Sequence, residues 1–345
     1  MKIFNYSPRL TLLAILILCL SAPASAQYFY HEGITYMMTD VNTAEVAGTY
    51  GNMSGTVEIP AVVTAMVEPM YSEPYEVTVT ITGIGAYAFE YNSSITEVIL
   101  PSTITYISAA AFYQCTSLSK VNLPNCLEYI SRNAFSYTGL KTIEIPESVT
   151  ELGWNVFYGC EQLTDVTLPN TITDLPGTFA WCTALEHINI PSSVTSLYDT
   201  FHGCTKLNNV VIPSSVTAIG QSTFYECNTL NDITCLAIVP PTLSNSNSFY
   251  SELFDVYATA MLRVPESSIG AYKAAPIWKL FVNINGITET VRGDINDDGE
   301  VNIGDINAII IFILKGEYND LADLNGDGEV NIADVNAVID IILRS

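Results

Sequence analysis

Positively charged residues are scarce in this sequence of 345 residues. Lysine and arginine together number 12, against 36 aspartates and glutamates, so the formal net charge at pH 7 is −24. Such a chain repels phosphate backbones and anionic lipid headgroups, which excludes nucleic acids and acidic membrane surfaces as partners. The chain is not predicted to be disordered, because 49% of its residues are hydrophobic and only 14% are charged.

Histidine is also scarce, with three in the chain. His31, His187 and His202 do not have the spacing of metal ligands, and the last two stand at positions of a repeat where ordinary residues occur elsewhere. They are therefore interpreted as surface substitutions. The sequence contains no nucleophile elbow, P-loop or dinucleotide-binding fingerprint. No catalytic residue is assigned and no enzyme is expected; a hydrolase with a carboxylate pair is the disfavoured alternative, since only the fold would bring such a pair together.

Long apolar runs are absent except at the start of the chain. Residues 10–20 form an apolar run that follows two basic residues and precedes the small residues 24–26. This pattern predicts a secretory signal peptide, residues 1–26, with cleavage before Gln27. The run is about half as long as a membrane-spanning helix requires. A retained anchor and a lipoprotein attached through Cys19 are the less favoured alternatives.

A repeat of 22 or 23 residues occupies the middle of the chain. Its clearest marker is a phenylalanine that recurs at spacings of 23, 23, 22, 22, 22 and 23 residues, and the leucine or isoleucine that opens each unit keeps the same period. This period predicts a solenoid, in which stacking of the units builds the core that one unit cannot form. The recurring phenylalanines are Phe89, Phe112, Phe135, Phe157, Phe179, Phe201 and Phe224.

Each unit contains a pattern for a short strand, L-x-x-V-x-L followed by proline. In the unit that starts at Leu163, this residue, Val166 and Leu168 are expected to point inward and the residues between them outward. Pro169 is expected to end the strand, because proline cannot donate to the next ladder. A second extended piece, S-V-T-x-(I/L), follows. One helical turn, F-x-x-C, is expected to carry the phenylalanine into the core.

The full unit, L-x-x-(V/I)-x-(I/L)-P-x-(S/T)-(V/I)-T-x-(I/L)-x-x-x-x-F-x-x-C, resembles the BspA-like class of bacterial leucine-rich repeats. Asn92 and Thr138 depart from it, because they stand where cysteine is expected. The resemblance covers residues 78–236 and implies a secreted or surface-displayed binding protein. The flanking residues 27–77 and 237–287 are expected to form an N-terminal β cap and a C-terminal cap, because a solenoid needs its open ends covered.

The expected C-terminal cap begins where the period breaks, after Leu236. Residues 244–252 are predicted to be a loop, residues 260–265 a last strand, and residues 267–279 a short amphipathic helix interrupted by Pro276. Four apolar residues are expected to plug the end of the core, with ligand binding by the tryptophan as the alternative. They are Tyr272, Ile277, Trp278 and Phe281.

Seven cysteines follow the signal peptide, and five of them share one repeat position. Stacked strands lie about 4.8 Å apart, which is within the Cα range of a disulfide, but side chains in a ladder point the same way. Buried free thiols that pack as small hydrophobic groups are therefore expected. The five are Cys115, Cys160, Cys182, Cys204 and Cys227.

The end of the chain contains two copies of D-x-N-x-D-G-E-V-N-I-x-D that start 29 residues apart. A calcium loop needs oxygen ligands at alternating positions around a sharp turn, with glycine at the sixth position. Two Ca²⁺ ions are therefore expected. The predicted ligands are Asp294, Asn296, Asp298, Glu300, Asn302 and Asp305 in the first loop, and Asp323, Asn325, Asp327, Glu329, Asn331 and Asp334 in the second, with each glutamate acting through its carbonyl.

Each loop runs directly into an apolar helix, residues 305–314 and 334–343, and no helix precedes the first loop. This duplicated loop–helix unit, residues 293–345 after a linker of residues 288–292, resembles the dockerin type I module. The resemblance implies a small all-α domain that needs calcium to fold and docks to a cohesin module on a scaffold or cell-surface protein. It also implies a cellulosome-like, polysaccharide-degrading setting.

The dockerin resemblance places the partner-facing residues at loop positions 10 and 11 and on the helix that follows. These positions hold Ile303 and Gly304 in the first copy and Ile332 and Ala333 in the second. An apolar pair suits a protein interface. The alternative is that the two isoleucines belong to the core.

The outward positions of the repeat strands are the expected surface for an unknown protein or glycan ligand. One row is Glu97, Lys120, Thr142, Asp165, His187, Asn209 and Asp232, and a parallel row is Ile99, Asn122, Glu144, Thr167, Asn189, Val211 and Thr234. Aromatic residues near the phenylalanine turns either pack at the edge of the core or stack on sugar rings. These are Tyr91, Tyr113, Tyr137, Tyr158, Trp181 and Tyr225.

The sequence thus predicts a leucine-rich repeat solenoid, β-rich with short helical turns and a cap at each end, followed by a small all-α calcium-binding dockerin domain. The predicted function is that of a secreted, non-catalytic binding protein that docks to a cohesin-bearing partner. One alternative is a surface adhesin whose terminal domain is a calcium-stabilised cap with no cohesin partner. Another is a carbohydrate-binding accessory protein.

Overall fold

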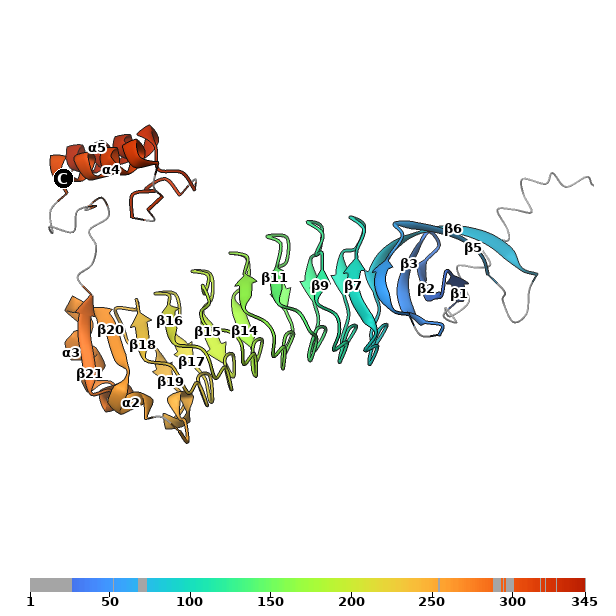
Figure 1. The fold of residues 1–345 in the computed structure, drawn as a ribbon, viewed down its shortest axis with the longest axis horizontal. Helices are drawn as coiled ribbons and strands as arrows, with labels where there is room; N and C mark the ends of the chain where they lie inside the picture. Colours follow the sequence, from blue (N-terminus) through green and yellow to red (C-terminus); the bar gives the residue numbers. More distant parts are fainter. Residues whose placement is uncertain are drawn as a thin grey trace, which may run out of the picture.

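The structure, a computed structural model, describes residues 27–51, 53–67, 73–253, 255–287, 293, 295, 301–316, 318–319, 321–326 and 328–344. The predicted signal peptide and the predicted linker lie outside these residues. Most of the described residues form a solenoid of stacked coils with an N-terminal β region, and the C-terminal residues form a pair of helices (Figure 1).

A twisted sheet covers the N-terminal end of the solenoid. Its strands β1 (Tyr28–His31), β2 (Ile34–Asp40) and β3 (Thr43–Thr49) pair antiparallel in sequence order. Strand β3 then pairs parallel with β6 (Tyr75–Ile84), and β6 pairs parallel with the first short strand of the solenoid. Strand β5 (Val62–Val67) forms a hairpin with β6. The sheet therefore caps the stack, as expected for an open solenoid end.

The first coil of the solenoid starts earlier in the chain than the sequence predicts. Strand β4 (Gly55–Glu58) pairs parallel with β7 (Ile95–Ile99), so β4 occupies the place of a repeat strand. The hairpin β5–β6 interrupts this coil, which hides its period from a repeat search. Val57 and Ile59 are buried at the positions that apolar residues fill in later units.

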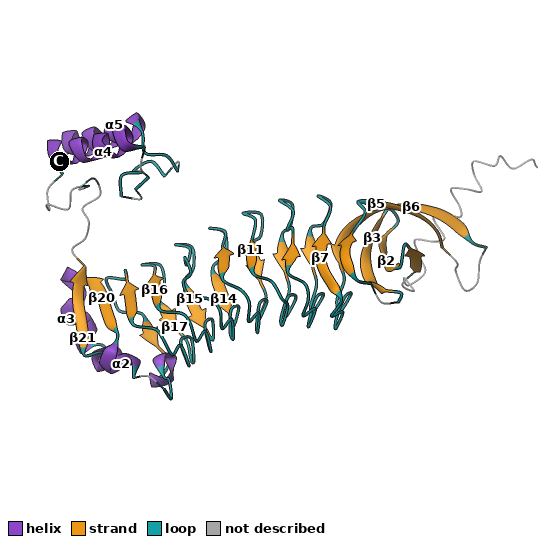
Figure 2. Ribbon diagram, viewed as in Figure 1, coloured by secondary structure: helices purple, strands orange, loops and turns teal. Residues whose placement is uncertain are grey.

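Most coils contribute a short parallel strand to each of two sides of the solenoid, and Figure 2 shows these strands in orange. The coil that opens at Leu185 has only a single bridge, from Asn189 to Val211, on the side of the longer strands. The longer strands are β7, β9 (Lys120–Val121), β11 (Thr142–Glu144), β13 (Asp165–Thr167), β16 (Asn209–Ile212), β18 (Asp232–Cys235), β20 (Met261–Pro265) and β21 (Asn283–Ile287). The shorter strands are β8 (Tyr106–Ile107), β10 (Tyr129–Ile130), β12 (Glu151–Leu152), β14 (Asp174–Pro176), β15 (Ser196–Tyr198), β17 (Ala218–Ile219) and β19 (Thr242–Leu243).

Burial along the longer strands agrees with the predicted alternation. Leu163, Val166 and Leu168 are buried, and the residues between them are exposed. Strands of neighbouring coils pair in register, so that Ile143 lies opposite Val166. Equivalent residues of successive units therefore stack on one another and form a continuous core along the solenoid.

The third side of each coil is a series of turns, and the predicted helical turn is wrong. The N–H groups of Ala110, Phe112 and Gln114 donate to carbonyls of the next coil at 2.8–3.0 Å. The N–H groups between them donate within their own coil instead, as Tyr113 does to Ala110 at 3.1 Å. Ala110 and Gln114 have φ angles of 53° and 56°. Alternate N–H groups therefore donate to the next coil and within their own coil, because a residue with left-handed backbone stands on each side of the phenylalanine. In a helix, all N–H groups donate within the same segment.

The phenylalanines form a stacked ladder through the core. Neighbouring rings lie 5.0–6.0 Å apart with interplanar angles of 18° or less. The ladder extends one coil beyond the prediction, because Phe249 stacks on Phe224. The residues predicted as a loop contain the 3₁₀ helix η1 (Ser246–Phe249) and follow β19, so this segment is a further coil. Its 25-residue spacing from Phe224 broke the period.

The ladder cysteines are free and buried, as predicted. Each thiol donates to the carbonyl oxygen of the phenylalanine in the preceding coil, as Cys182 does to Phe157 at 3.2 Å. The same bond joins the other four cysteines to their phenylalanines at 3.0–3.2 Å. Burial raises the pKa of Cys160 to about 11 and the pKa of Cys115 and Cys204 to about 12.

The C-terminal end of the core is closed by the predicted plug. It contains α2 (Val256–Thr259), η2 (Glu266–Ser268), α3 (Ile269–Ala274) and η3 (Trp278–Leu280), with Pro276 after the end of α3. Tyr272, Trp278 and Phe281 are buried, whereas Ile277 is only half-buried. The Trp278 Nε1 donates to the Pro241 carbonyl oxygen at 2.7 Å. Trp278 is therefore a core residue.

The C-terminal helices are α4 (Ile303–Lys315) and α5 (Ile332–Arg344), in agreement with the predicted positions. They pack against each other around Ile309, Ala322, Leu324, Val335 and Val338. Within the described residues, none of the helices has the length and apolar character needed to span a bilayer.

Candidate binding surfaces and calcium loops

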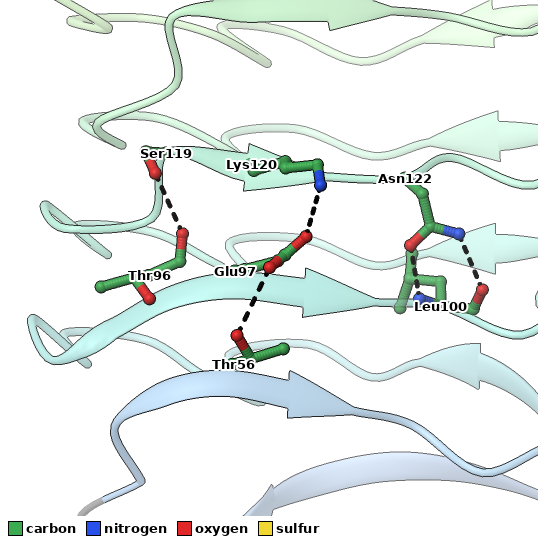
Figure 3. Close-up of polar contacts among 7 residues, drawn as sticks. All are labelled: Thr56, Thr96, Glu97, Leu100, Ser119, Lys120 and Asn122. Atoms are coloured by element: carbon green, nitrogen blue, oxygen red, sulfur yellow. Dashed lines mark hydrogen bonds and ion pairs between the residues drawn. The ribbon is translucent and has the colours of Figure 1, made fainter.

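The outward face of the longer strands carries the two predicted rows of side chains. Figure 3 shows the N-terminal end of these rows, where the side chains bond to neighbouring coils. The Lys120 Nζ lies 2.7 Å from the Glu97 Oε1, and the Thr56 hydroxyl donates to the Glu97 Oε2 at 3.3 Å. Hydrogen bonding from Lys120 holds the pKa of the Glu97 carboxyl below its usual value. These groups join three successive coils.

Asn122 also joins coils at this end of the solenoid. Its Oδ1 accepts from the Leu100 N–H at 2.8 Å and its Nδ2 donates to the Leu100 carbonyl oxygen at 2.9 Å (Figure 3). The amide thus continues the backbone ladder where β9 ends. The middle part of the rows lies further along the solenoid. Its exposed members are Thr142, Asp165, His187 and Asn209 in one row, and Glu144, Thr167, Asn189 and Val211 in the other.

A line of aromatic rings follows the phenylalanine ladder along the solenoid. Each ring belongs to a residue one or two positions after a ladder phenylalanine. Ring centroids of successive members lie 5.0–5.7 Å apart in the pairs that contact each other. We name this set the aromatic strip. It consists of Tyr91, Tyr113, Tyr137, Tyr158, Trp181, His202, Tyr225 and Tyr250.

Sequence reasoning found six members of the strip and missed His202 and Tyr250. His202 is not the predicted surface substitution, because it is half-buried between the rings of Trp181 and Tyr225. Burial lowers the pKa of its imidazole, and the carboxylates of Asp199 and Glu226 oppose this shift in part. At neutral pH His202 is therefore a neutral aromatic ring, and its place in the repeat was the signal that could have identified it.

The two other histidines lie elsewhere on the solenoid. His31 is the last residue of β1, and His187 is exposed on the outward strand face. His187 is thus a surface residue, as predicted, whereas His31 is half-buried. We assign no catalytic role to these histidines or to the outward side chains of the longer strands.

The second loop of the helical domain curls around the carboxylate of Asp323. The Asp323 Oδ1 accepts from the Gly326 N–H at 2.8 Å, and its Oδ2 accepts from the Gly328 N–H at 2.9 Å. Gly326 and Gly328 have φ angles of 73° and 84°, which glycine adopts without a steric penalty. The glycine at the sixth loop position thus makes the sharp turn that the motif requires.

The closing carboxylates of the two loops, Asp305 and Asp334, bond in the same way. The Oδ1 of each accepts from an N–H at the start of its own loop, that of Ile295 at 2.6 Å and that of Leu324 at 2.9 Å. The Oδ2 of each accepts from the N–H of the ninth loop residue, at 2.8 Å and 2.9 Å respectively. Both carboxylates are fully buried. Each loop is therefore tied at both ends to its closing aspartate.

The asparagines at the ninth loop position begin the helices. The Asn302 Oδ1 accepts from the Gly304 N–H at 2.7 Å, and the Asn331 Oδ1 accepts from the Ala333 N–H at 2.8 Å. Together with Asp305, Asn302 completes a capping box at α4. This structural role was not predicted, although an asparagine three residues before an aspartate signals it.

The described part of the loops fits calcium by the chemistry of its donors. Carboxylate and amide oxygens are the ligands that Ca²⁺ prefers, and the described candidates are Asn302, Asp305, Asp323, Asn325, Glu329, Asn331 and Asp334. Within the residues that the structure describes, no group of three His, Cys, Asp or Glu side chains lies in a metal-ligating arrangement. The remaining predicted ligands lie outside those residues. They are Asp294, Asn296, Asp298, Glu300 and Asp327.

The predicted partner-facing isoleucines are on the surface. Ile303 is 72% exposed and Ile332 is 68% exposed, so the alternative that they belong to the core is wrong. Ala333 is also exposed, and Gly304 is half-buried. Both isoleucines are the first residues of their helices.

Each helix carries a stripe of exposed apolar side chains that starts at its isoleucine. The stripe on α4 contains Ile303, Ile310 and Leu314, and the stripe on α5 contains Ile332, Ile339 and Leu343. The spacing is seven and then four residues in both helices, so the three side chains share one helix face. The sequence indicated apolar helices but did not separate the core face from this second face.

Two protein family models match the chain. The family model described as the BspA type leucine rich repeat region matches six copies over residues 82–200 and 176–262. The model of the dockerin type I domain matches residues 292–343. No curated protein matches the chain.

Several solved structures are similar to the solenoid. A leucine-rich repeat protein from Bacteroides ovatus ATCC 8483 is 25% identical, with a TM-score of 0.44, over 75% of this chain and 76% of that protein. The leucine rich repeat protein of T. pallidum is 26% identical, with a TM-score of 0.48, over 61% of this chain and 90% of that protein. One from Bacteroides capillosus ATCC 29799 is 28% identical, with a TM-score of 0.32, over 41% of this chain and 97% of that protein.

Proposed function

The chain belongs to the BspA-type leucine-rich repeat proteins and carries a C-terminal dockerin type I domain, and from this premise we propose that it is a secreted, docked binding protein. The solenoid recognises a protein or glycan ligand. The helical domain attaches the chain, in the presence of calcium, to a cohesin-bearing scaffold or cell-surface protein of a polysaccharide-degrading assembly. Both families consist typically of non-catalytic binding or structural modules.

The observation that carries this proposal is the pair of apolar stripes on α4 and α5. Ile303 and Leu314 begin and end one stripe, and Ile332 and Leu343 begin and end the other, all with more than two thirds of their surface exposed. Exposing such side chains to water is unfavourable, and grouped exposed apolar residues on a small domain mark an interaction site. Because the two stripes have the same spacing, either helix offers the partner an equivalent surface.

Calcium has a defined place in this proposal. The six predicted ligands of each loop would hold one ion; those of the second loop are Asp323, Asn325, Asp327, Glu329, Asn331 and Asp334. A bound cation supplies charge neutralisation among carboxylates that otherwise repel one another. The residues of this chain provide the rest: the closing aspartates tie the loop ends, and the asparagines begin the helices that present the stripes.

The proposed chain division follows the sequence prediction: a signal peptide of residues 1–26, caps of residues 27–77 and 237–287, repeats of residues 78–236 and a dockerin domain of residues 293–345. Strand β4 and the coil around Phe249 support counting one further coil at each end of the repeats. The predicted signal peptide would direct export of the chain.

A capture experiment with the full mature chain tests the docking. The immobilised protein is incubated with secreted and surface proteins of the producing cell, once with Ca²⁺ and once with EDTA. We expect a cohesin-bearing protein to be retained with Ca²⁺ and lost with EDTA. The double variant Ile303→Asp/Ile332→Asp should lose it, whereas each single variant should keep it, because the second stripe remains.

The matched control is Val239→Asp, which places the same charge on an exposed apolar residue of the solenoid. This variant should capture the partner as the wild type does. If the helical domain folds with Ca²⁺ and no partner is retained, the docking proposal is wrong, and the adhesin with a calcium-stabilised terminal cap replaces it.

A further inference from the structure

The aromatic strip differs from the phenylalanine ladder in that several of its rings reach the surface. Tyr91, Tyr137 and Trp181 all stand two positions after a ladder phenylalanine, and they are 61%, 36% and 39% exposed. The strip residues of the coils between them, Tyr113 and Tyr158, stand one position after the phenylalanine and are half-buried. Between Phe89 and Phe179, exposed rings therefore recur in every second coil; beyond Trp181, His202 and Tyr225 are half-buried and Tyr250 is 44% exposed. Since stacked strands lie about 4.8 Å apart, the interval between rings two coils apart is about 10 Å.

The rings of Tyr137 and Trp181 are seated on glycines of the next coil. A Cβ atom on Gly159 would lie 2.5 Å from the Tyr137 Cδ1, and one on Gly203 would lie 2.7 Å from the Trp181 Cδ2. Each ring thus occupies the space that a side chain on the next coil would fill, with one side against the backbone. The half-buried rings contact the exposed ones nearly edge to face, as Tyr113 and Tyr158 do with Tyr137, at 89° and 70°. This packing fixes the ring positions before any ligand binds.

Carboxylates lie near part of the strip. Besides burial, the charge of Glu161 raises the pKa of Tyr137, and the charges of Glu226 and Glu252 raise the pKa of Tyr225. Burial lowers the pKa of His202, and the charges of Asp199 and Glu226 oppose this shift. The whole chain carries a net charge of −24. A polyanionic ligand is therefore disfavoured at this surface, while hydroxyl groups could donate to the carboxylates. A neutral, hydroxyl-rich ligand fits both features.

We propose that the aromatic strip binds a neutral, extended, β-linked polysaccharide, whose alternate sugar rings stack on Tyr91, Tyr137 and Trp181. In an extended β-1,4-linked chain, successive sugars turn over, so equivalent faces recur once per disaccharide. A disaccharide is comparable in length with the interval of two coils. The apolar face of each sugar covers an aromatic ring, and its edge hydroxyls bond to nearby polar groups. This inference deepens the proposed function and rests on its assignment of a ligand to the solenoid.

A polypeptide ligand is less well matched to the strip. Peptides bind through backbone hydrogen bonds to a strand edge or through side chains inserted into pockets, whereas the strip follows turns whose N–H groups donate to neighbouring coils or within their own. A regular series of rings on a rigid surface instead suits a ligand with a regular ring repeat. A peptide that binds through these same residues would therefore overturn the proposal.

Native affinity electrophoresis of the full chain tests the proposal, because the acidic protein migrates well at neutral pH. The gels contain hydroxyethyl cellulose, a neutral β-1,4-linked glucan; dextran, an α-linked glucan; or polygalacturonate, an anionic polymer. We expect hydroxyethyl cellulose alone to retard the wild type. Trp181→Ala should weaken this binding about tenfold and Tyr137→Ala/Trp181→Ala further, since a central aromatic anchor contributes more than about 1.4 kcal/mol, which is a factor of ten. Trp181→Phe should keep most of the binding.

The matched control is Trp154→Ala, which removes an indole outside the strip that is more exposed than that of Trp181. Trp154 is 52% exposed and contacts Tyr198, at 5.6 Å between ring centroids. Its removal should leave the retardation unchanged. Three results would each overturn the proposal: no retardation of a folded wild type by hydroxyethyl cellulose, equal retardation by dextran, or equal loss of binding in Trp154→Ala and Trp181→Ala.

Loss of polysaccharide binding by the aromatic strip can be distinguished from loss of calcium-dependent docking. The strip variants keep both apolar stripes of the helical domain, so calcium-dependent capture of the docking partner should be the same in Tyr137→Ala/Trp181→Ala as in the wild type. If capture persists while hydroxyethyl cellulose fails to retard the wild type, the strip assignment alone is wrong.

Discussion

Each ladder cysteine is held as a neutral thiol by the coil around it. The Sγ of Cys182 or Cys204 has a carbonyl oxygen as its partner and no access to water. Cys126, in contrast, is half-buried near the surface. We expect iodoacetamide to modify Cys126 in the native mature chain at pH 8 and to leave the five ladder cysteines unmodified, because the thiolate is the reactive species. Peptide mass spectrometry after brief labelling measures this.

Denaturation provides the control for the labelling experiment. In guanidinium chloride all seven cysteines of the mature chain should react, and in the Cys126→Ala variant native labelling should almost vanish. Modification of Cys182 at the rate of Cys126 in the native chain would show that the ladder opens or that the register is wrong. Recovery of a disulfide between ladder positions would contradict the free thiols.

The same cysteines make the solenoid sensitive to alkali. Their pKa values are raised in the folded state, to about 11 for Cys160 and about 12 for Cys115, from a usual value of 9.0. The stabilisation of the neutral thiol is therefore complete below about pH 9 and is lost as the pH rises towards 11. We expect the melting temperature of the solenoid to fall steeply over this range. A Cys160→Ala variant should lose less stability between pH 9 and 11, and an equal loss would contradict the assignment.

Two glycines hold the strip rings in place at the cost of a left-handed backbone. Gly159 and Gly203 have φ angles of 70° and 73°, and a Cβ at either would meet an aromatic ring. Gly159→Ala and Gly203→Ala should each destabilise the solenoid by about 2 kcal/mol, through backbone strain and ring displacement. Chemical denaturation measures the loss.

Gly270 is the matched control for these substitutions. It lies in α3, where an added Cβ atom would have no neighbour within 4 Å outside the helix backbone, and its φ is not positive. Gly270→Ala should therefore leave stability unchanged or raise it by up to about 1 kcal/mol, because alanine is the better helix former. If Gly270→Ala lost as much stability as Gly203→Ala, the contact between an added Cβ atom and the aromatic ring would not explain the loss.

At the scale of the coil, the inward and outward positions of one extended segment should differ in their tolerance of a charged side chain. Leu185 is fully buried, and His187, two residues later, is exposed on the outward face. Leu185→Asp should destabilise the solenoid by more than about 4 kcal/mol, since it buries an unpaired charge in the middle of the stack. His187→Asp puts the same group into water and should change stability little. Comparable melting of both variants would refute the register of the repeat.

Sequence reasoning identified the coils in which the repeat period is not interrupted by an insertion. A 22-residue period maps directly onto one turn of the stack, so Leu163, Val166 and Phe179 could be assigned to the core from spacing alone. Strand β4 was missed because the hairpin β5–β6 separates it from the rest of its coil. The coil of Phe249 was missed because extra residues lengthen its spacing, while ring stacking on Phe224 restores it in space.

The candidate surfaces were less predictable than the core, for a different reason. The calcium motif specifies ligand positions, but it does not reveal that Asn302 and Asp305 also cap a helix. Helical spacing could not show which apolar face of α4 remains exposed, because both faces are apolar. The turn conformation on the third side depends on hydrogen bonds to the next coil, which no single unit contains. Contacts between coils are the information that local sequence lacks.

At the scale of the whole molecule, two structures with different sources of stability share one chain. The solenoid has a continuous apolar core from Phe29 to Ile284, whereas the helical domain has a small core around Ile309 and Val338. A core of that size is marginal without a further stabilising element. Calcium therefore should control the folding of the helical domain and leave the solenoid unaffected.

We expect calorimetry of the mature chain to show two unfolding transitions with Ca²⁺ and one with EDTA. The transition that EDTA removes should be the helical one, and helical circular dichroism should fall with it. Asp334→Ala, which removes a tie between the ends of the second loop, should weaken the same transition even with Ca²⁺ present. Leu185→Asp should do the reverse, removing the solenoid transition and retaining the calcium-dependent one. Loss of both transitions in EDTA would mean that the two structures fold as one unit, and an attachment domain that folds independently of the binding surface would no longer describe this chain.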